Sequence, residues 1–164
     1  MNEEKERKPG KVMMTCGKIC CGKTTYARNL KERTGAPILS IDDIMLTLFP
    51  EGAGEKHDAF VLRAEKNLLS FSLQLLATGK DVILDWGLWT REQRNRLRAF
   101  YRQHGVKTEI HYLRIDREEW ERRINARNQL QQDDAYYVDE GLIRKVEALF
   151  EEPSPDEVDF MIDC

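Results

Sequence analysis

One short motif restricts the fold of this chain more than any other feature of its sequence. Residues 17–24 read Gly-Lys-Ile-Cys-Cys-Gly-Lys-Thr and match the phosphate-loop pattern G-x-x-x-x-G-K-[ST] at every fixed position. The glycines let the backbone fold tightly, so that successive N–H groups point inward at phosphate oxygens. In this pattern Lys23 places a cation at the β- and γ-phosphates, and the Thr24 hydroxyl binds magnesium. The residues expected at the nucleotide are Gly17, Lys18, Ile19, Cys20, Cys21, Gly22, Lys23, Thr24 and Thr25.

The flanking segments decide whether the motif is a binding loop or an ordinary glycine turn. Residues 11–16 form an apolar run of strand length, and residues 24–30 are predicted to form a helix that ends near Gly35. A strand, a glycine loop and a helix in this order are the arrangement that the phosphate loop requires. The N-terminus of the helix adds the positive end of its dipole. The sequence therefore predicts a site for the phosphates of a nucleotide.

The size and composition of the chain are typical of one globular domain. It has 164 residues, of which 41% are hydrophobic and 34% charged. We expect a flexible N-terminal tail at residues 1–10 and a single domain over residues 11–164. The net charge of −3 argues against a dedicated nucleic-acid binder. No signal peptide or membrane-spanning run is found, and the four cysteines form neither a disulfide framework nor a zinc pattern, so a cytoplasmic location is expected.

Hydrophobic periodicity and turn residues predict strands and helices that alternate along the chain. Strands are predicted at residues 11–16, 36–41, 81–85, 108–115 and 158–162, and helices at residues 24–35, 44–48, 57–77, 90–104, 117–130 and 138–150. In the longest helix, an apolar stripe of Phe60, Ala64, Leu68, Phe71 and Leu75 is expected to be buried. Such alternation favours an α/β fold with a parallel sheet covered on both faces.

Three predicted strands end in residues that suit phosphate chemistry. Gly17, Asp42 and Asp85 each follow or end a predicted strand. Ligands of parallel α/β sheets bind outside the carboxyl ends of the strands. We therefore expect the phosphate loop and the two carboxylates to meet in one crevice.

The carboxylates have distinct expected roles. Asp42 is the candidate general base that takes a proton from an acceptor alcohol, and its alternative role is a helix N-cap. Asp43 is the weaker candidate beside the acceptor and is favoured as the cap. Asp85 is expected to hold magnesium through water, together with Thr24; alternatively, it bonds the backbone of a nearby loop.

Arginines and an aromatic residue complete the candidate site. Arg123 and Arg127 are four residues apart, on one helical face, next to a polar segment at residues 129–134 that is expected to form a lid. Arginines that close over phosphates stabilise the charge of the transition state. The alternative for this pair is surface ion pairing with Glu119.

The sequence gives weaker signals for the residues that would bind the acceptor. Trp86 directly follows Asp85 and is expected either to line the acceptor pocket or to pack in the core. Arg94 is the best placed of an arginine stripe that also contains Arg91, Arg98 and Arg102. This stripe is expected either to meet a phosphorylated acceptor or to be a solvated helix face.

Several of these segments resemble a known family. The phosphate loop, residues 40–43 and residues 82–85 resemble the small P-loop kinases related to polynucleotide kinase, zeta toxin and chloramphenicol phosphotransferase. Residues 121–128 and 150–153 are similar to those of bacterial proteins described as predicted AAA-type ATP-binding kinases. The resemblance covers residues 11–164, although Cys20 stands where relatives usually carry glycine.

The resemblance implies a three-layer P-loop NTPase fold, with a five-stranded parallel sheet flanked by helices and a small lid. It also implies that Asp42 is the general base and that Arg123 and Arg127 bind the phosphates of ATP. The expected function is an ATP- and Mg²⁺-dependent kinase that phosphorylates a hydroxyl of a small molecule or nucleotide, with a nucleic-acid end less favoured.

The same residues are also compatible with other functions. They are a nucleotide-binding switch or regulatory NTPase without a dedicated acceptor, a toxin-like kinase of nucleotide sugars, and a nucleoside monophosphate kinase. Members of such a family differ widely in acceptor, so the resemblance does not choose among substrates. A monomer or weak homodimer is expected, without a membrane partner.

Overall fold

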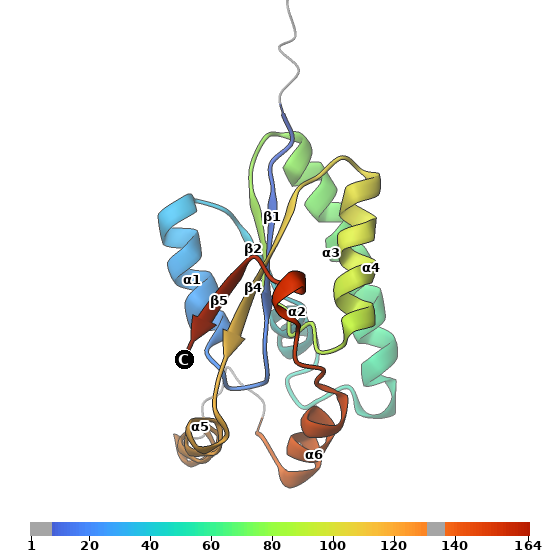
Figure 1. Ribbon diagram of the computed structural model, residues 1–164. Helices are drawn as coiled ribbons and strands as arrows, with labels where there is room; N and C mark the ends of the chain where they lie inside the picture. Colours follow the sequence, from blue (N-terminus) through green and yellow to red (C-terminus); the bar gives the residue numbers. More distant parts are fainter. Residues whose placement is uncertain (1–7, 131–136) are drawn as a thin grey trace, which may run out of the picture.

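The computed structural model describes residues 8–130 and 137–164 of the chain. These residues fold around a five-stranded parallel sheet with the strand order β2-β3-β1-β4-β5 (Figure 1). The strands are β1 Val12–Cys16, β2 Ile38–Leu39, β3 Val82–Leu84, β4 Thr108–Arg114 and β5 Phe160–Asp163. The predicted five-stranded parallel sheet is therefore confirmed. Most of the expected tail and lid lie outside the described residues.

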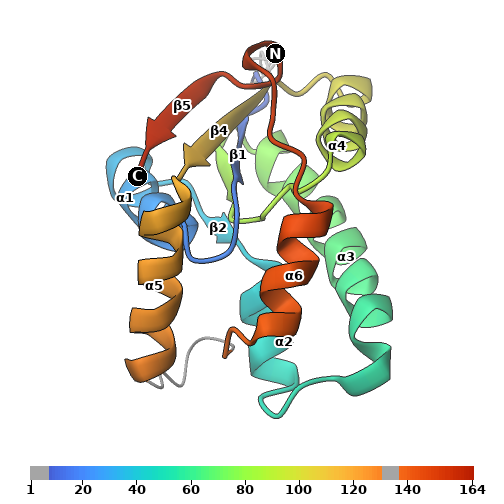
Figure 2. The ribbon, with the colours of Figure 1, turned by 60° about the horizontal axis from the view of Figure 1, so that its bottom comes forward.

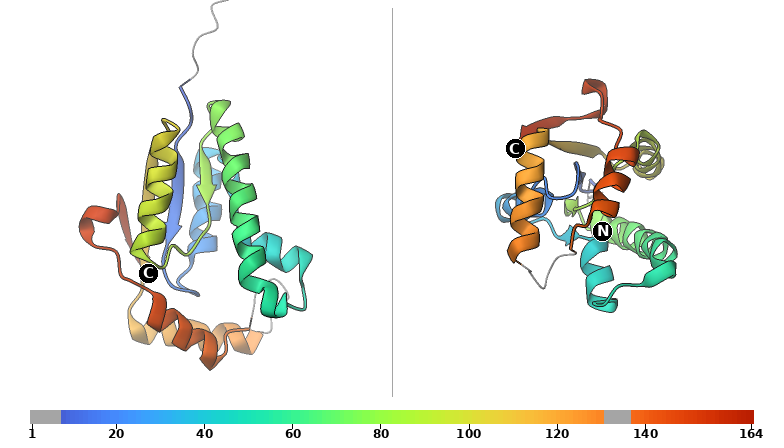
Figure 3. Two further views of the ribbon diagram at one scale, coloured as in Figure 1. Left: turned by 90° about the vertical axis from the view of Figure 1, so that its right-hand side faces the viewer. Right: turned by 90° about the horizontal axis from the view of Figure 1, so that it is seen from below.

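Helices cover both faces of the sheet (Figure 3). The helices are α1 Lys23–Thr34, α2 Ile41–Leu48, α3 His57–Ala77, α4 Arg91–Gln103, α5 Arg117–Leu130 and α6 Glu140–Leu149, with short 3₁₀ turns at Gly54–Lys56 and Pro155–Glu157. Helices α3 and α4 cover one face and α1 covers the other. None of these helices is long and apolar enough to cross a membrane.

The central strand explains why this arrangement is stable. All five residues of β1 are buried, because β3 and β4 pair with it on either side and helices cover both faces. Val12 and Met14 pack in the cluster shared with α3 and α4, whereas Met13 packs against Ala27 and Leu30 of α1. A strand that is buried on both faces reads as a continuous apolar run, as this one does.

Helices α5 and α6 lie beyond the carboxyl ends of the strands (Figures 1 and 2). Trp120 and Ile124 of α5 form a third apolar cluster with Val146 of α6. Ile19 and Cys20 of the phosphate loop pack against the same cluster. This cluster therefore attaches the two helices to the loop.

Two details of the fold differ from the sequence-based prediction. The second strand ends at Leu39, and the N-cap of α2 is Ser40, whose hydroxyl accepts a hydrogen bond of 3.2 Å from the N–H of Asp43. The prediction that Asp43 or Asp42 caps this helix was therefore wrong. The expected buried stripe of α3 is correct at Leu68, which is buried, but wrong at Phe71, which is 45% exposed. The other buried residues of this helix are Leu69, Ser72 and Leu76.

Candidate active site at the carboxyl edge of the sheet

Strand β1 runs directly into the phosphate loop. The N–H of Gly17 donates a hydrogen bond of 2.9 Å to the carbonyl of Gly87. A Cβ at Gly17 would lie 2.7 Å from Cys21 Sγ and 2.9 Å from the carbonyl oxygen of Leu113, so a larger residue does not fit. Gly22 precedes α1 with φ of 97°, a conformation that residues with side chains rarely adopt. Both fixed glycines of the motif are thus required by the turn from β1 into α1.

The first two residues of α1 carry the polar groups of the motif. The ammonium of Lys23 donates a hydrogen bond of 2.5 Å to the carbonyl of Lys18 and lies 3.8 Å from Cys21 Sγ. This contact keeps the cation within the loop. The hydroxyl of Thr24 donates a hydrogen bond of 2.8 Å to Asp85 Oδ2, at the end of β3.

Asp85 is held by a residue that the sequence analysis did not single out. The hydroxyl of Thr15, in β1, lies 3.4 Å from Asp85 Oδ1 and donates to the carbonyl of Trp86 at 2.8 Å. Burial raises the pKa of the Asp85 carboxyl, while the hydrogen bond from Thr24 and the charge of Lys23 act to lower it. The sequence signal for this role of Thr15 was its hydroxyl, which stands in an otherwise apolar strand.

Asp42 lies in the first turn of α2, directly beyond the short strand β2. Its side chain reaches solvent, but the surrounding protein removes part of its hydration, and this raises the pKa of the carboxyl. The charges of Lys23 and Arg127 lower this pKa, and the charge of Asp85 raises it. The geometry thus brings Asp42 within electrostatic reach of the phosphate loop and of the β3 carboxylate.

Two arginines of α5 contact cysteines of the phosphate loop. Arg123 Nη1 donates a hydrogen bond of 3.1 Å to the carbonyl of Cys21, and its Nε donates to Glu119 at 2.6 Å. Arg127 Nη1 lies 3.2 Å from Cys20 Sγ, and its Nε is buried without a hydrogen-bond partner among the described residues. The ion pair of Arg123 with Glu119 therefore coexists with the contact to the loop.

The phosphate loop also has an aromatic support that the sequence analysis did not include. The indole N–H of Trp120 donates a hydrogen bond of 2.7 Å to the carbonyl of Ile19. The ammonium of Lys18 lies 4.5 Å from the centroid of the Trp120 ring. As the fourth residue of a charged helix, Trp120 gave no local signal of this contact, because its partners lie about a hundred residues earlier.

Trp86 and Arg94, two of the three residues expected at the acceptor, have different surroundings. Trp86 is 6% exposed and packs with the apolar cluster beneath α2 and α3. Arg94 is 1% exposed and donates hydrogen bonds to Glu157 at 2.9 Å and to the carbonyls of Leu88 and Glu151 at 3.0 and 2.9 Å. These contacts engage the guanidinium with the protein itself, so Arg94 fastens the segment before β5 onto α4. Arg94 therefore stabilises the fold in place of the expected contact with an acceptor.

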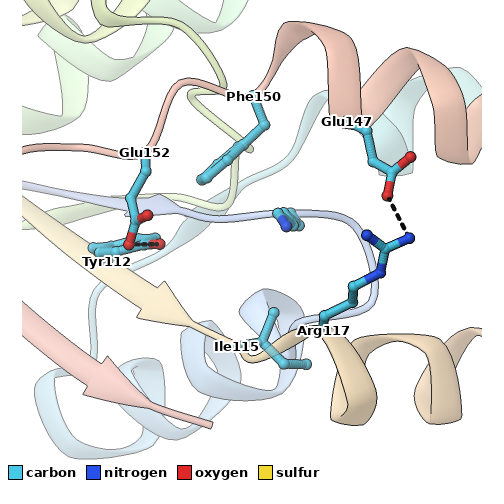
Figure 4. A pocket seen from close by; sticks show the side chains of 7 residues that line it. Tyr112, Ile115, Arg117, Glu147, Phe150 and Glu152 are labelled. Carbon is cyan, nitrogen blue, oxygen red and sulfur yellow. Dashed lines mark hydrogen bonds and ion pairs between the residues drawn. The ribbon is translucent and has the colours of Figure 1, made fainter.

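A separate pocket of about 390 Å³ lies on the β4 side of the loop (Figure 4). Its lining residues are Lys18, Tyr112, Ile115, Arg117, Glu147, Phe150 and Glu152. Arg117 and Glu147 form an ion pair of 3.7 Å across it, and the Tyr112 hydroxyl donates to Glu152 at 3.3 Å. Neither Asp42 nor Asp85 lines this pocket, so it is distinct from the carboxylate site.

The donor set at the end of β3 suits one kind of metal. Thr24 and Asp85 provide oxygen ligands, which Mg²⁺ prefers, and Mg²⁺ keeps several of its waters when it binds beside phosphates. The described residues contain no cluster of three or more histidine, cysteine or acidic side chains that would enclose a metal completely. The site therefore fits a magnesium ion held jointly by protein and nucleotide.

Comparison with solved structures places the fold among kinases. A sugar kinase from Janibacter sp. HTCC2649 has 19% sequence identity and a TM-score of 0.68, over 94% of this chain and 86% of that chain. Kti12 from Chaetomium thermophilum, solved with ADP-AlF3, has 16% identity and a TM-score of 0.71, over 93% and 88% of the two chains. The Pnkp1/Rnl/Hen1 RNA repair complex has 17% identity and a TM-score of 0.71, over 91% of this chain and 46% of that chain. At these identities the likeness shows the fold alone.

Comparison of sequences identifies the family. No curated protein matches the chain. The sequence pattern of the AAA domain family AAA_33 matches residues 12–153, which is most of the chain. With the glycine loop, the parallel sheet and the carboxyl-edge carboxylates described above, this match shows that the chain belongs to the AAA_33 family and has a kinase-like P-loop fold.

Proposed function

We propose that this protein is an ATP- and Mg²⁺-dependent phosphotransferase that moves the γ-phosphoryl group of ATP to a hydroxyl of an acceptor. The observation that carries the proposal is the surroundings of Asp42: the charges of Lys23, Asp85 and Arg127 all act on the pKa of its carboxyl. A group that only begins a helix does not need to lie among these three. A general base would act at such a position, because the acceptor hydroxyl has to lose its proton beside the phosphates that Lys23 is proposed to hold.

The residues have separate roles in the proposed reaction. The N–H groups of the loop and the ammonium of Lys23 hold the phosphates, and Arg123 and Arg127 close on them from α5. Thr24 and Asp85 would hold magnesium, which would offset the charge of the phosphates. Asp42 accepts the proton of the acceptor hydroxyl as its oxygen bonds to the γ-phosphorus and the bond to the β-phosphate oxygen breaks, which releases ADP.

Structures with the same fold support this assignment. They include an APS kinase of Mycobacterium tuberculosis in complex with AMPPNP and APS, and a gluconokinase of Sinorhizobium meliloti. The sugar kinase and Pnkp1 share the fold as well. These proteins act on chemically different acceptors, so their names support phosphoryl transfer and leave the acceptor open.

The test separates binding from transfer. The Asp42→Asn variant is expected to bind ATP as the wild type does and to lose transfer, because the amide cannot accept the proton. ATP turnover is measured with sugars, nucleosides, nucleotide sugars and 5′-hydroxyl oligonucleotides, each against a control without acceptor. Turnover that no acceptor stimulates identifies a switch or NTPase, and transfer by the variant at the wild-type rate removes Asp42 from the role of base.

A further inference from the structure

The pocket on the β4 side of the phosphate loop is built on fixed backbone. The N–H of Glu151 donates a hydrogen bond of 2.8 Å to the carbonyl of Trp89, and Arg94 donates one of 2.9 Å to the carbonyl of Glu151. These contacts hold the segment that carries Phe150 and Glu152, whose side chains line the pocket (Figure 4). The pocket is therefore preformed, and its volume of about 390 Å³ is typical of sites for small molecules.

The side chain of Lys18 brings a cation to this pocket. Its ammonium lies 4.5 Å from the centroid of the Trp120 ring and 5.8 Å from that of the Phe150 ring. Aromatic rings do not neutralise the charge, and no carboxylate of the described residues forms an ion pair with Lys18. The other cation of the pocket, Arg117, is paired with Glu147 at 3.7 Å. Lys18 is thus the cation of the pocket that an anionic group of a ligand would meet.

The side chain of Glu152 brings a carboxylate to the same pocket. It accepts a hydrogen bond of 3.3 Å from the hydroxyl of Tyr112, and no cation pairs with it within residues 8–130 and 137–164. Tyr112 is 4% exposed, and its ring stacks on that of Phe150 with the centroids 6.3 Å apart. Burial and the charge of Glu152 raise the pKa of Tyr112, so the hydroxyl remains a neutral donor. It orients the carboxylate without offsetting its charge.

We propose that this pocket binds a small zwitterion, namely a free amino acid with an apolar side chain. The carboxylate of the ligand pairs with Lys18 and its ammonium pairs with Glu152, so that each of these two charges gains a partner of opposite sign. Ile115 and Phe150 provide apolar surface for the side chain of the ligand. A ligand with one charge would pair with one of the two groups and meet the like charge of its own sign at the other.

Matched compounds test the class of ligand. Phenylalanine carries both charges, phenylethylamine lacks the carboxylate, and phenylpropionate lacks the ammonium. Calorimetry on nucleotide-free wild-type protein is expected to show that phenylalanine binds about tenfold more tightly than either derivative, since each derivative loses one charge-assisted hydrogen bond. Equal binding of either derivative overturns the proposal, and so does an absence of binding by both phenylalanine and leucine.

Two variants assign each charge of the ligand to one residue. In Glu152→Gln the preference for phenylalanine over phenylpropionate is expected to vanish, whereas the preference over phenylethylamine remains because Lys18 still binds the carboxylate. Lys18→Met is expected to have the reverse effect. Glu151→Gln is the matched control, because this neighbouring carboxylate accepts a hydrogen bond of 2.8 Å from the N–H of Arg91 and does not line the pocket. Equal weakening of all three compounds in either variant contradicts the assignment of the two charges.

The pocket is expected to bind its ligand independently of the nucleotide. The N–H of Lys18 is expected at the phosphates, but its side chain lines the pocket, and neither Thr24 nor Asp85 does so. Protein saturated with a non-hydrolysable ATP analogue is therefore expected to bind phenylalanine as nucleotide-free protein does. Loss of phenylalanine binding under this condition would make the pocket part of the nucleotide site and overturn the proposal. A failure to transfer phosphate to any acceptor would contradict the proposed kinase activity alone.

Discussion

The hydroxyl of Thr24 donates a hydrogen bond of 2.8 Å to the carboxylate of Asp85. This contact joins the first turn of α1 to the end of β3 and so fixes the loop against the neighbouring strand. Both oxygens are of the kind that Mg²⁺ prefers, and Asp85 is held further by Thr15. The pair therefore serves the fold of the loop and the proposed metal site at the same time.

Replacing this carboxylate is expected to weaken the use of magnesium. Asp85→Asn keeps the shape of the side chain but removes the charge, so the concentration of Mg²⁺ for half-maximal activity should rise by about tenfold or more. Asp81→Asn, at the other end of the same strand segment, is the control, since Asp81 accepts a hydrogen bond from the N–H of Lys11 and is not part of the proposed metal site. Activity is titrated with Mg²⁺ at fixed ATP. Equal magnesium curves for Asp85→Asn and wild type would remove Asp85 from the metal site.

Asp42 should destabilise the folded chain at neutral pH. The side chain of Asp42 reaches solvent, but the surrounding protein removes part of its hydration and so raises the pKa of its carboxyl in the folded state; the folded protein therefore binds this proton more tightly than the unfolded chain does. The stability that the group contributes is full below its unfolded pKa, about 3.9, and is lost as the pH rises through the folded pKa. Asp42→Asn is therefore expected to raise the melting temperature at pH 7.5. The gain should vanish near pH 3.5.

Thermal unfolding at several pH values checks this expectation. A constant difference between variant and wild type across the pH range would contradict an electrostatic origin. A lower melting temperature for Asp42→Asn at pH 7.5 would show that the carboxylate stabilises the fold, and would weaken the case that it is kept for catalysis.

Sequence patterns predicted the elements with local signals well. The bounds of α3 and α5 were predicted to the residue. Errors arose where two residues were both suited to the same structural role. Ser40 and Asp42 are both good N-caps, and only the point at which the backbone leaves the extended conformation decides between them.

Contacts between distant segments were not predictable. Arg94 reads as one member of a basic stripe, but its partner Glu157 lies 63 residues later in the sequence. In α3 a stripe through Phe71 and a stripe through Ser72 fit the helical period equally well. The Ser72 hydroxyl bonds the Tyr101 hydroxyl at 2.8 Å across the α3–α4 contact, which fixes the rotation of the helix. The carboxyl-edge arrangement of Gly17, Asp42 and Asp85 was predictable because it follows from parallel strands alone.

Arg127 is expected to act on the rate of transfer. Its guanidinium contacts Cys20 of the phosphate loop, and its charge also acts on the pKa of Asp42. Arg127→Met should lower kcat by about 100-fold, since loss of a charge donor to a phosphoryl transition state has an effect of this order. Arg122→Met is the control, because among the described residues this exposed arginine pairs only with Glu119 on its own helix. Steady-state values of kcat for both variants test this prediction. A similar loss of kcat in both would mean that α5 itself is disturbed.

Arg94 is expected to matter for stability and not for catalysis. Burial alone would raise the pKa of Glu157, but hydrogen bonds from Arg94 and Ser154 lower it to about 2. Arg94→Met leaves this carboxylate buried without its cation, which costs about 3 kcal/mol in the free energy of unfolding. A carboxyl with a lowered pKa stabilises the fold above its unfolded pKa, about 4.3, and this contribution is lost as the pH falls toward 2.

Urea unfolding of wild type and Arg94→Met between pH 7 and pH 2.5 measures both effects. The two proteins should differ most at neutral pH and converge in acid, where Glu157 is protonated in the variant and loses its advantage in the wild type. At temperatures where the variant is folded, its KM values for ATP and acceptor should equal those of the wild type, because the guanidinium is 1% exposed and its hydrogen bonds all go to the protein itself. A raised acceptor KM in a folded variant would instead restore Arg94 to the acceptor site.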